Sequence, residues 1–208
     1  MRHAHDCLSG LGAGAGTFGA GADNTRVVSA QTDPQVIARS VQLPSAFEAI
    51  FERHFDPVHR YLSRRAGRER ADDLASQTFV VAFARRESFR SDATDARPWL
   101  FGIATKLLAN DRRSEQRLLE TYGRLSGDAR DVLVPTPDSD RDVADALAQL
   151  DPAQRDVLLL HAWADLSYEE IADALDIPVG TVRSRLSRAR ASLQTVLAQP
   201  LRTQQEVS

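Results

Sequence analysis

Cysteine, lysine and long hydrophobic runs are nearly absent from this 208-residue chain. Cys7 is the only cysteine, so the chain cannot form an internal disulfide or a zinc site built from several cysteines. No apolar run reaches the roughly 20 residues that a membrane-spanning helix needs. Met1–Ala22 is rich in glycine and alanine but lacks the basic start and apolar centre of a signal peptide. We therefore expect a protein of the reducing cytoplasm, without membrane insertion or a lipid anchor on Cys7.

Arginine supplies nearly all of the positive charge, since Lys106 is the only lysine. The formal net charge of −3 conceals an uneven distribution along the chain. The stretch Ile177–Leu197 holds four arginines and no carboxylate, whereas aspartates gather between Asp128 and Asp145. Local charge decides whether a surface attracts nucleic acid, so the acidic total does not exclude DNA binding.

The stretch Ser167–Leu197 has the pattern of two helices joined by a tight turn. Ser167 and Glu170 are spaced as a capping box, in which each side chain bonds a free backbone N–H at the helix start. The turn contains Pro178, which suits the first turn of the next helix. Apolar residues then recur at helical spacing and predict a buried face: Val182, Leu186, Ala189, Leu193 and Val196. This arrangement predicts a helix-turn-helix, whose second helix commonly enters the major groove of DNA.

The opposite face of that second helix carries small, hydroxylated and arginine side chains. At about 100° per residue it comprises Gly180, Thr181, Arg183, Ser184, Ser187 and Arg188. Guanidinium groups can fork onto guanine edges or bind phosphates, and Gly180 lets a DNA backbone approach closely. The alternative is an amphipathic helix with a solvated arginine face, which the capped helix and turn before it make less favourable.

Helical patterns also fill much of the first half of the chain. Residues 1–42 have few large apolar side chains, so we expect a disordered tail there. Aromatic and aliphatic residues then recur every three or four positions in Leu43–Leu62, which predicts a helix with a core face. A second helix, Arg70–Phe83, is apolar enough to be well buried. Asp72 and Asp73 fall in its predicted first turn, where they either cap the helix or form an acidic docking point for a partner's basic helix.

A polar loop, Phe89–Pro98, precedes a third helix that opens on Trp99. Basic and amide side chains lie along the loop and the helix: Arg90, Lys106, Asn110, Arg112 and Arg113. A tryptophan at a helix start usually belongs to the core. Beside basic side chains it can also support an unstacked base, because single-stranded DNA is held by stacking and by backbone charge.

The helical pattern fades at residues 118–141, where glycines, prolines and aspartates indicate an acidic linker. Asp151 followed by Pro152 then predicts another helix start. His161 in that helix either packs against its neighbours or faces a phosphate. We therefore predict an all-α fold of two small helical domains. The predicted limits are a tail at 1–42, a first domain at 43–117, the linker at 118–141, the helix-turn-helix domain at 142–199 and a tail at 200–208.

The two halves together resemble the extracytoplasmic-function (ECF) sigma factors of bacteria. The matching segments are Ala71–Leu74 with Gln77 and Phe79 for region 2.2, Trp99–Ala104 for the start of regions 2.3–2.4, and Leu166–Ala172 with Pro178–Arg190 for region 4.2. The last segment is highly specific, and finding both halves in this order strengthens the resemblance. Lys106 departs from the family, which commonly has asparagine there. An ammonium group, unlike an amide, cannot accept a hydrogen bond from a base.

The resemblance implies a role for each set of residues. Docking on the β′ clamp helices of RNA polymerase would use Asp72, Asp73 and Gln77. The helix-turn-helix domain, at the β flap, would contact the promoter −35 element through Thr181, Arg183, Ser184, Ser187 and Arg188, with His161 near the DNA backbone. Capture of the opened −10 strand would use Arg90, Trp99, Lys106, Asn110, Arg112 and Arg113. The acidic linker would thread toward the active-site channel of the polymerase.

We therefore predict a promoter-specificity subunit that binds core RNA polymerase, recognises the −35 and −10 elements and helps to melt the latter. The resemblance also implies an anti-sigma factor as a partner. The alternative is a stand-alone helix-turn-helix regulator, which would carry a phosphoacceptor or ligand domain with alternating strands. No paired carboxylates, nucleophile–base set or phosphate loop occurs at useful spacing, so we expect neither an enzyme nor a cofactor.

Overall fold

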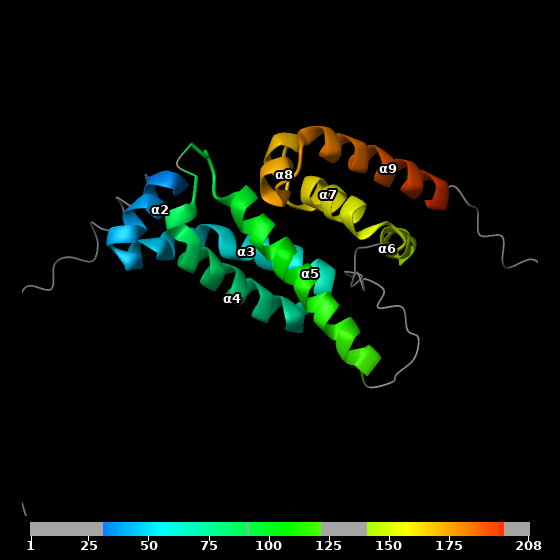
Figure 1. Ribbon diagram of the computed structural model, residues 1–208, viewed down its shortest axis with the longest axis horizontal. Helices are drawn as coiled ribbons and strands as arrows, with labels where there is room; N and C mark the ends of the chain where they lie inside the picture. The colour runs from blue at the N-terminus through cyan, green and yellow to red at the C-terminus, as the bar shows by residue number, and fades with distance from the viewer. Residues whose placement is uncertain (1–30, 91, 122–140, 198–208) are drawn as a thin grey trace, which may run out of the picture. The chain divides into compact units, whose positions relative to one another are not determined.

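The computed structural model describes residues 31–90, 92–121 and 141–197. Throughout these residues the regular structure is helical and no strand occurs, which confirms the all-α prediction. The first group of helices comprises α2 (Asp33–Gln42), a 3-10 turn (Pro44–Phe47), α3 (Glu48–Ala66), α4 (Arg68–Arg85), a second 3-10 turn (Arg86–Ser88) and α5 (Arg97–Thr121) (Figure 1). The second group comprises α6 (Arg141–Ala148), α7 (Pro152–Trp163), α8 (Tyr168–Leu175) and α9 (Val179–Leu197). None of these helices is long and apolar enough to span a membrane.

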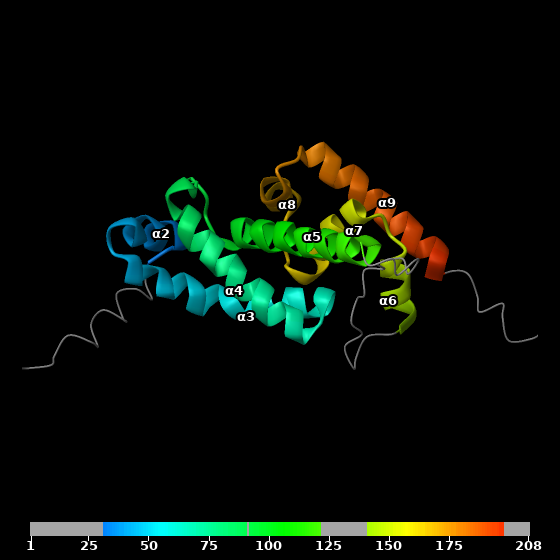
Figure 2. The ribbon, with the colours of Figure 1, turned by 60° about the horizontal axis from the view of Figure 1, so that its bottom comes forward.

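Helices α3, α4 and α5 pack side by side and enclose the core of the first group (Figure 2). Ile50 and Leu62 of α3 are fully buried, as are Leu100 and Phe101 at the start of α5. Phe79 of α4 lies edge-on to Phe51 of α3, with ring centroids 5.0 Å apart. Burial of each large apolar side chain contributes about 1.5–3 kcal/mol, so this core holds the three helices at fixed positions.

The predicted disordered tail is wrong in its last part, because Asp33–Gln42 forms helix α2. Thr32 and Gln35 form a capping box at its start, and Val36 and Ile37 are buried. These two large apolar residues follow a long Gly/Ala-rich stretch, which dilutes their signal in the sequence. The predicted linker limits of 118 and 141 are also wrong, because α5 continues to Thr121 and α6 begins at Arg141. Residues 1–30 of the predicted N-terminal tail, residues 122–140 of the acidic linker and the C-terminal tail lie outside the described residues.

Arg65 ends α3 as a buried cation, with 1% of its surface exposed. Its guanidinium donates hydrogen bonds to the hydroxyl of Tyr61 and to the carboxylate of Asp156 in α7, both at 2.6 Å. Burial by itself would lower the pKa of Arg65, but the oxygens of Tyr61 and Asp156 raise it above its usual value. The charge is therefore retained, as a buried ion requires when it is paired and hydrogen-bonded.

Gly102 lies at a close approach between α5 and α8. A Cβ added to Gly102 would lie 2.3 Å from the carbonyl oxygen of Ala174. Glycine costs about 1 kcal/mol relative to alanine inside a helix, yet no residue with a side chain fits at this crossing. The backbone of α8 therefore rests directly on α5, at a point three residues after Trp99.

Candidate DNA and polymerase interfaces

Helices α8 and α9 form the predicted helix-turn-helix. The hydroxyl of Ser167 accepts a hydrogen bond from the N–H of Glu170 at 3.2 Å, and the Glu170 carboxylate accepts one from the N–H of Ser167 at 2.8 Å. This pair is the capping box expected from the sequence. Asp176 ends α8 in the left-handed conformation, with φ of 56°, and α9 begins at Val179. The turn therefore spans three residues.

Helix α9 has one buried and one open face. Val182, Leu186 and Ala189 are at most 1% exposed, which confirms the predicted core side over this part of α9, whereas Leu193 is only half-buried. The predicted DNA-contacting residues lie on other sides of the helix: Arg183, Ser187 and Arg188 are exposed, whereas Thr181 and Ser184 are half-buried. An added Cβ on Gly180 would meet no atom within 4 Å, so the surface at the start of α9 is open.

Two side chains on the open face of α9 have partners within the chain. The guanidinium of Arg183 lies 3.8 Å from the carboxylate of Glu169 in α8, and both side chains are well exposed. Such exposed ion pairs contribute little, about 0–1 kcal/mol, so Arg183 can exchange this partner for another anion. The hydroxyl of Ser184 donates a hydrogen bond to the carbonyl oxygen of Thr181 at 3.0 Å, within α9 itself.

His161 lies on α7 and is half-buried. Its Nδ1 lies 2.9 Å from the carbonyl oxygen of Leu166, which can only accept, so Nδ1 carries the proton and donates. The ring also meets Tyr168 edge-on, with centroids 5.4 Å apart. These contacts fix the imidazole against the loop that leads to α8, which favours the packing role considered for His161.

The acidic pair Asp72 and Asp73 lies beyond the first turn of α4, because this helix begins at Arg68. The N-terminal capping role considered for these residues is therefore wrong. Asp72 accepts a hydrogen bond from Nε2 of His59 at 2.7 Å and remains largely exposed. Asp73 and Gln77 are exposed one turn apart on α4, as an outward-facing contact surface requires.

Val80 extends this surface and was not expected from the sequence. It is 68% exposed, the highest value among the large apolar residues found exposed in the described part of the chain. Val80 follows Asp73 by seven residues, so Asp73, Gln77 and Val80 share one side of α4. The dense run of apolar residues predicted a well-buried helix, whereas α4 has an exposed stripe on which Val80 follows Asp73 and Gln77.

Four of the predicted −10 residues form a stripe along α5. Trp99, Lys106, Asn110 and Arg113 are spaced by seven, four and three residues, which keeps them within one side of the helix. The indole of Trp99 meets the ring of Phe89 at 5.0 Å and stays partly exposed. Arg113 donates a hydrogen bond to the amide oxygen of Asn110 at 2.6 Å. The stripe thus combines an aromatic ring at the helix start with cations further along.

Arg112 and Arg90 have other surroundings. Arg112 lies about 140° around α5 from Trp99 and donates to the carbonyl oxygen of Arg65 at 3.2 Å, at the end of α3. The structure thus separates it from the stripe on α5. Arg90, in the loop before α5, pairs with both oxygens of Asp92 at 3.1 and 2.9 Å and with Asp173 of α8 at 3.1 Å.

Two protein-family comparisons match the two groups of helices. Sigma-70 region 2 matches residues 50–118, and sigma-70 region 4 matches residues 140–193. The ECF RNA polymerase sigma-E factor of Haemophilus influenzae is 31% identical over 185 residues, covering 82% of this chain and 97% of that protein. The ECF RNA polymerase sigma factor SigL of Mycobacterium tuberculosis is 32% identical over 159 residues, or 72% of this chain and 87% of SigL.

Solved structures of similar proteins agree with these matches. CnrH, in complex with the cytosolic domain of CnrY, is 26% identical with a TM-score of 0.59, covering 80% of this chain and 97% of CnrH. The sigma factor RpoE of Bartonella quintana, in complex with the anti-sigma factor NepR, is 25% identical with a TM-score of 0.61. That comparison covers 74% of this chain and 98% of RpoE.

The chain thus joins a helical domain, with Asp73 and Gln77 exposed on α4, to a helix-turn-helix domain, and the two family matches define this pair as a transcription initiation factor. The chain belongs to the ECF RNA polymerase sigma factors of the sigma-70 family. It directs RNA polymerase to promoters, as predicted, and is not a stand-alone regulator. Sigma factors of this family are initiation factors and not enzymes.

Proposed function

We propose that α9 reads the −35 element of the promoter with Arg183, Ser187 and Arg188, flanked by Thr181 and Ser184. The observation that carries this proposal is the opposition of two faces on α9. Val182, Leu186 and Ala189 are buried, while the arginine face is exposed and carries no carboxylate of its own helix. Gly180 is open to an approaching phosphate backbone at the helix start, where backbone N–H groups attract anions. His161 of α7 supports this face indirectly, because it packs against the loop that leads to α8.

The stripe on α5 receives the opened −10 strand in this proposal. Trp99 offers a ring on which an unpaired base stacks, and Lys106 and Arg113 supply cations for the phosphates that follow. Asn110 offers an amide, which can both donate to and accept from a base edge. Arg90 contacts the strand from the loop after releasing its carboxylate partners, whereas Arg112 supports the fold at the end of α3.

The exposed stripe on α4 docks on the clamp helices of the polymerase β′ subunit in this proposal. Asp73 and Gln77 face outward without a capping role, and Val80 adds apolar surface beside them. An apolar centre with charged neighbours is the common composition of a specific protein interface. Asp72 borders this surface, and the helix-turn-helix domain engages the β flap.

A protein inhibitor of this sigma factor is part of the proposal. Of the two solved structures that this chain resembles over most of its length, CnrH is bound to the cytosolic domain of CnrY and RpoE to the anti-sigma factor NepR. The proposed place of action is the cytoplasm, where RNA polymerase works. Residues 122–140 of the acidic linker remain assigned by the sequence alone.

The proposal is tested with the full-length chain, core RNA polymerase and a promoter found by mapping transcripts that rise on overexpression. Trp99→Ala, Arg188→Ala and Asp73→Arg should each retain the fold, because all three side chains reach solvent. We expect them to impair promoter opening, −35 recognition and core binding, respectively. Protein that binds this promoter tightly without core polymerase, or variants that all fail in the same step, would contradict the assignment of roles.

A further inference from the structure

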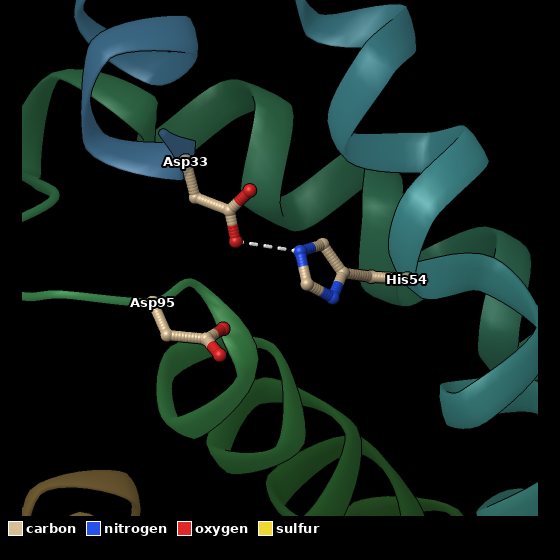
Figure 3. A group of neighbouring side chains, drawn as sticks. All are labelled: Asp33, His54 and Asp95. Atoms are coloured by element: carbon tan, nitrogen blue, oxygen red, sulfur yellow. Dashed lines mark hydrogen bonds and ion pairs between the residues drawn. The ribbon is translucent and has the colours of Figure 1, made fainter. Parts of the chain in front are cut away.

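Asp33, the first residue of α2, lies at a junction of three segments (Figure 3). One oxygen, Oδ2, accepts hydrogen bonds from Nε2 of His54 in α3 at 2.6 Å and from the backbone N–H of Ala96 at 3.1 Å. The other, Oδ1, accepts from the guanidinium of Arg53 at 2.9 Å. Asp33 therefore connects the N-terminal helix to α3 and to the residue that immediately precedes α5.

Asp33, His54 and Asp95 could also suggest a metal site, since one potential ligand atom of each lies within 4.8 Å of the others. Both carboxylates already have cationic partners, however. Asp95 accepts hydrogen bonds from the backbone N–H and from Nε of Arg97, each at 2.7 Å. Asp33 accepts one from the guanidinium of Arg53. A divalent ion would have to displace both arginines, so the contacts describe a network of hydrogen bonds and not a metal site.

The side chain of Asp33 is 11% exposed and is charged. Burial alone would raise the pKa of this carboxyl group, but the hydrogen bonds from His54, Ala96 and Arg53 hold it well below its ordinary 3.8. A charged acceptor forms a stronger hydrogen bond with a backbone N–H than a neutral one does. The hydrogen bond from Ala96 therefore has a charged acceptor at neutral pH.

Ala96 sets the start of α5. It is fully buried, and its carbonyl oxygen accepts the first hydrogen bond of the helix, from the N–H of Leu100 at 2.9 Å. With its N–H held by Asp33, the residue is fixed on both sides. Trp99 follows three residues later and packs against Phe89, which comes from the other end of the loop.

We propose that Asp33 is a positioning residue for −10 strand capture: it fixes Ala96, and through Ala96 the orientation in which α5 presents Trp99 to an unpaired base. This inference rests on the proposed function of the α5 stripe. It also gives α2 a function, although α2 precedes the segment that matches sigma-70 region 2, residues 50–118. Removal of the acceptor should loosen the start of α5 without disturbing α4, whose outward stripe engages the polymerase.

The test compares Asp33→Ala, Asp33→Asn and a matched control, Asp56→Asn, an exposed carboxylate on α3. Amide hydrogen exchange of the free chain reports on Ala96 directly. We expect its exchange to become about tenfold faster in Asp33→Ala, because a charge-assisted hydrogen bond is lost. Amides of α4 should keep their wild-type rates. Asp33→Asn keeps an oxygen acceptor and should restore most of the protection.

The functional arm uses holoenzyme and the mapped promoter with 2-aminopurine in its −10 element, whose fluorescence rises when the duplex opens. We expect Asp33→Ala to lower the fraction opened by about tenfold at unchanged affinity for core polymerase. Asp33→Asn and Asp56→Asn should open the promoter nearly as wild type does. If Asp33→Ala does not fold, Asp33→Glu replaces it, since the longer side chain keeps the charge but displaces the acceptor.

Normal opening by Asp33→Ala, an equal loss of core affinity, or failure of Asp33→Asn to rescue would each overturn the inference. A failure of the proposed function has a different signature. In that case Trp99→Ala opens the promoter normally, or the wild type yields no promoter-specific transcript, while the exchange of Ala96 still depends on Asp33.

Discussion

Gly102 of α5 and Ala174 of α8 are in direct backbone contact, because a Cβ on Gly102 would stand 2.3 Å from the Ala174 carbonyl oxygen. Gly102→Ala should therefore lower the free energy of unfolding by about 1–3 kcal/mol, as overpacking does in a tightly packed interior. The loss should appear even though alanine is the better helix former. Urea unfolding of the free chain measures it, and a variant as stable as wild type would show that α8 can move away at no cost.

Gly180→Ala provides the matched opposite case. Nothing lies within 4 Å of the added Cβ at the exposed start of α9. We expect the free chain to gain about 0.5–1 kcal/mol of stability, since alanine restricts the unfolded backbone and favours the helix. Binding of holoenzyme to the −35 element should weaken, because the methyl group stands where the DNA backbone approaches. Unchanged DNA affinity in the stabilised variant would argue against a close approach there.

Arg188→Ala tests whether the exposed face of α9 reads bases. If Arg188 contacts a base edge, the variant should lose about 1–3 kcal/mol of discrimination at one position of the −35 element. Holoenzyme affinity is measured on promoters carrying single substitutions along that element. Arg190→Ala is the control for charge alone, since Arg190 is exposed on the same helix. Equal weakening of Arg188→Ala on every sequence would instead assign Arg188 to a phosphate.

Asp73→Arg should weaken binding to core polymerase by roughly tenfold or more, because a like charge opposite a basic helix is unfavourable by several kcal/mol. The free chain should retain its stability to within about 0.5 kcal/mol, since Asp73 is exposed. Glu52→Arg makes the same change of charge at an exposed site on α3 and should bind core polymerase normally. Affinity is measured by titrating core enzyme with fluorescently labelled chain. Equal effects of the two reversals would indicate net charge and not a docking surface.

Asp33 should make the free energy of unfolding of the chain depend on pH in the acidic range. Its pKa is lower in the folded chain than the ordinary 3.8, so the unfolded state binds the proton first as the pH falls. The stabilisation is therefore complete above the ordinary pKa and declines as the pH drops below it toward the folded value. Unfolding free energies measured between about pH 6 and about pH 2 should fall more steeply for wild type than for Asp33→Asn. Parallel curves would mean that Asp33 is not the titrating group.

The helix-turn-helix could be predicted from the sequence because its signals are local. The capping box of Ser167 and Glu170 and the spacing of Val182 and Leu186 depend only on neighbouring residues, and the structure contains each feature as expected. The fold class followed from the same kind of pattern. Local signals also have limits: the apolar run of α4 did not reveal that Val80 faces solvent.

Features that depend on distant contacts could not be predicted. Helix α2 is short, and its buried residues find their partners elsewhere in the first helical group. The position of Asp72 was predicted to be the first turn, but α4 begins several residues earlier, at Arg68. Arg112 was grouped with the −10 residues because of its charge, whereas its place on α5 directs it to the end of α3. The spacing of Arg112 from Trp99 would have excluded it from the stripe, and only its contact with the end of α3 depends on the fold.

The ion pair between Arg183 and Glu169 has a consequence for the ionic-strength dependence of promoter binding. A cation that neutralises a phosphate normally releases a condensed counterion from DNA, and each such contact steepens the decline of affinity with added salt. Arg183 must first give up its weak, exposed contact with the Glu169 carboxylate 3.8 Å away, and this internal contact is itself screened as salt rises. Arg183 should therefore contribute less than a full unit to the slope of log affinity against log salt concentration, because the carboxylate of Glu169 on the neighbouring helix competes with the DNA phosphate for it.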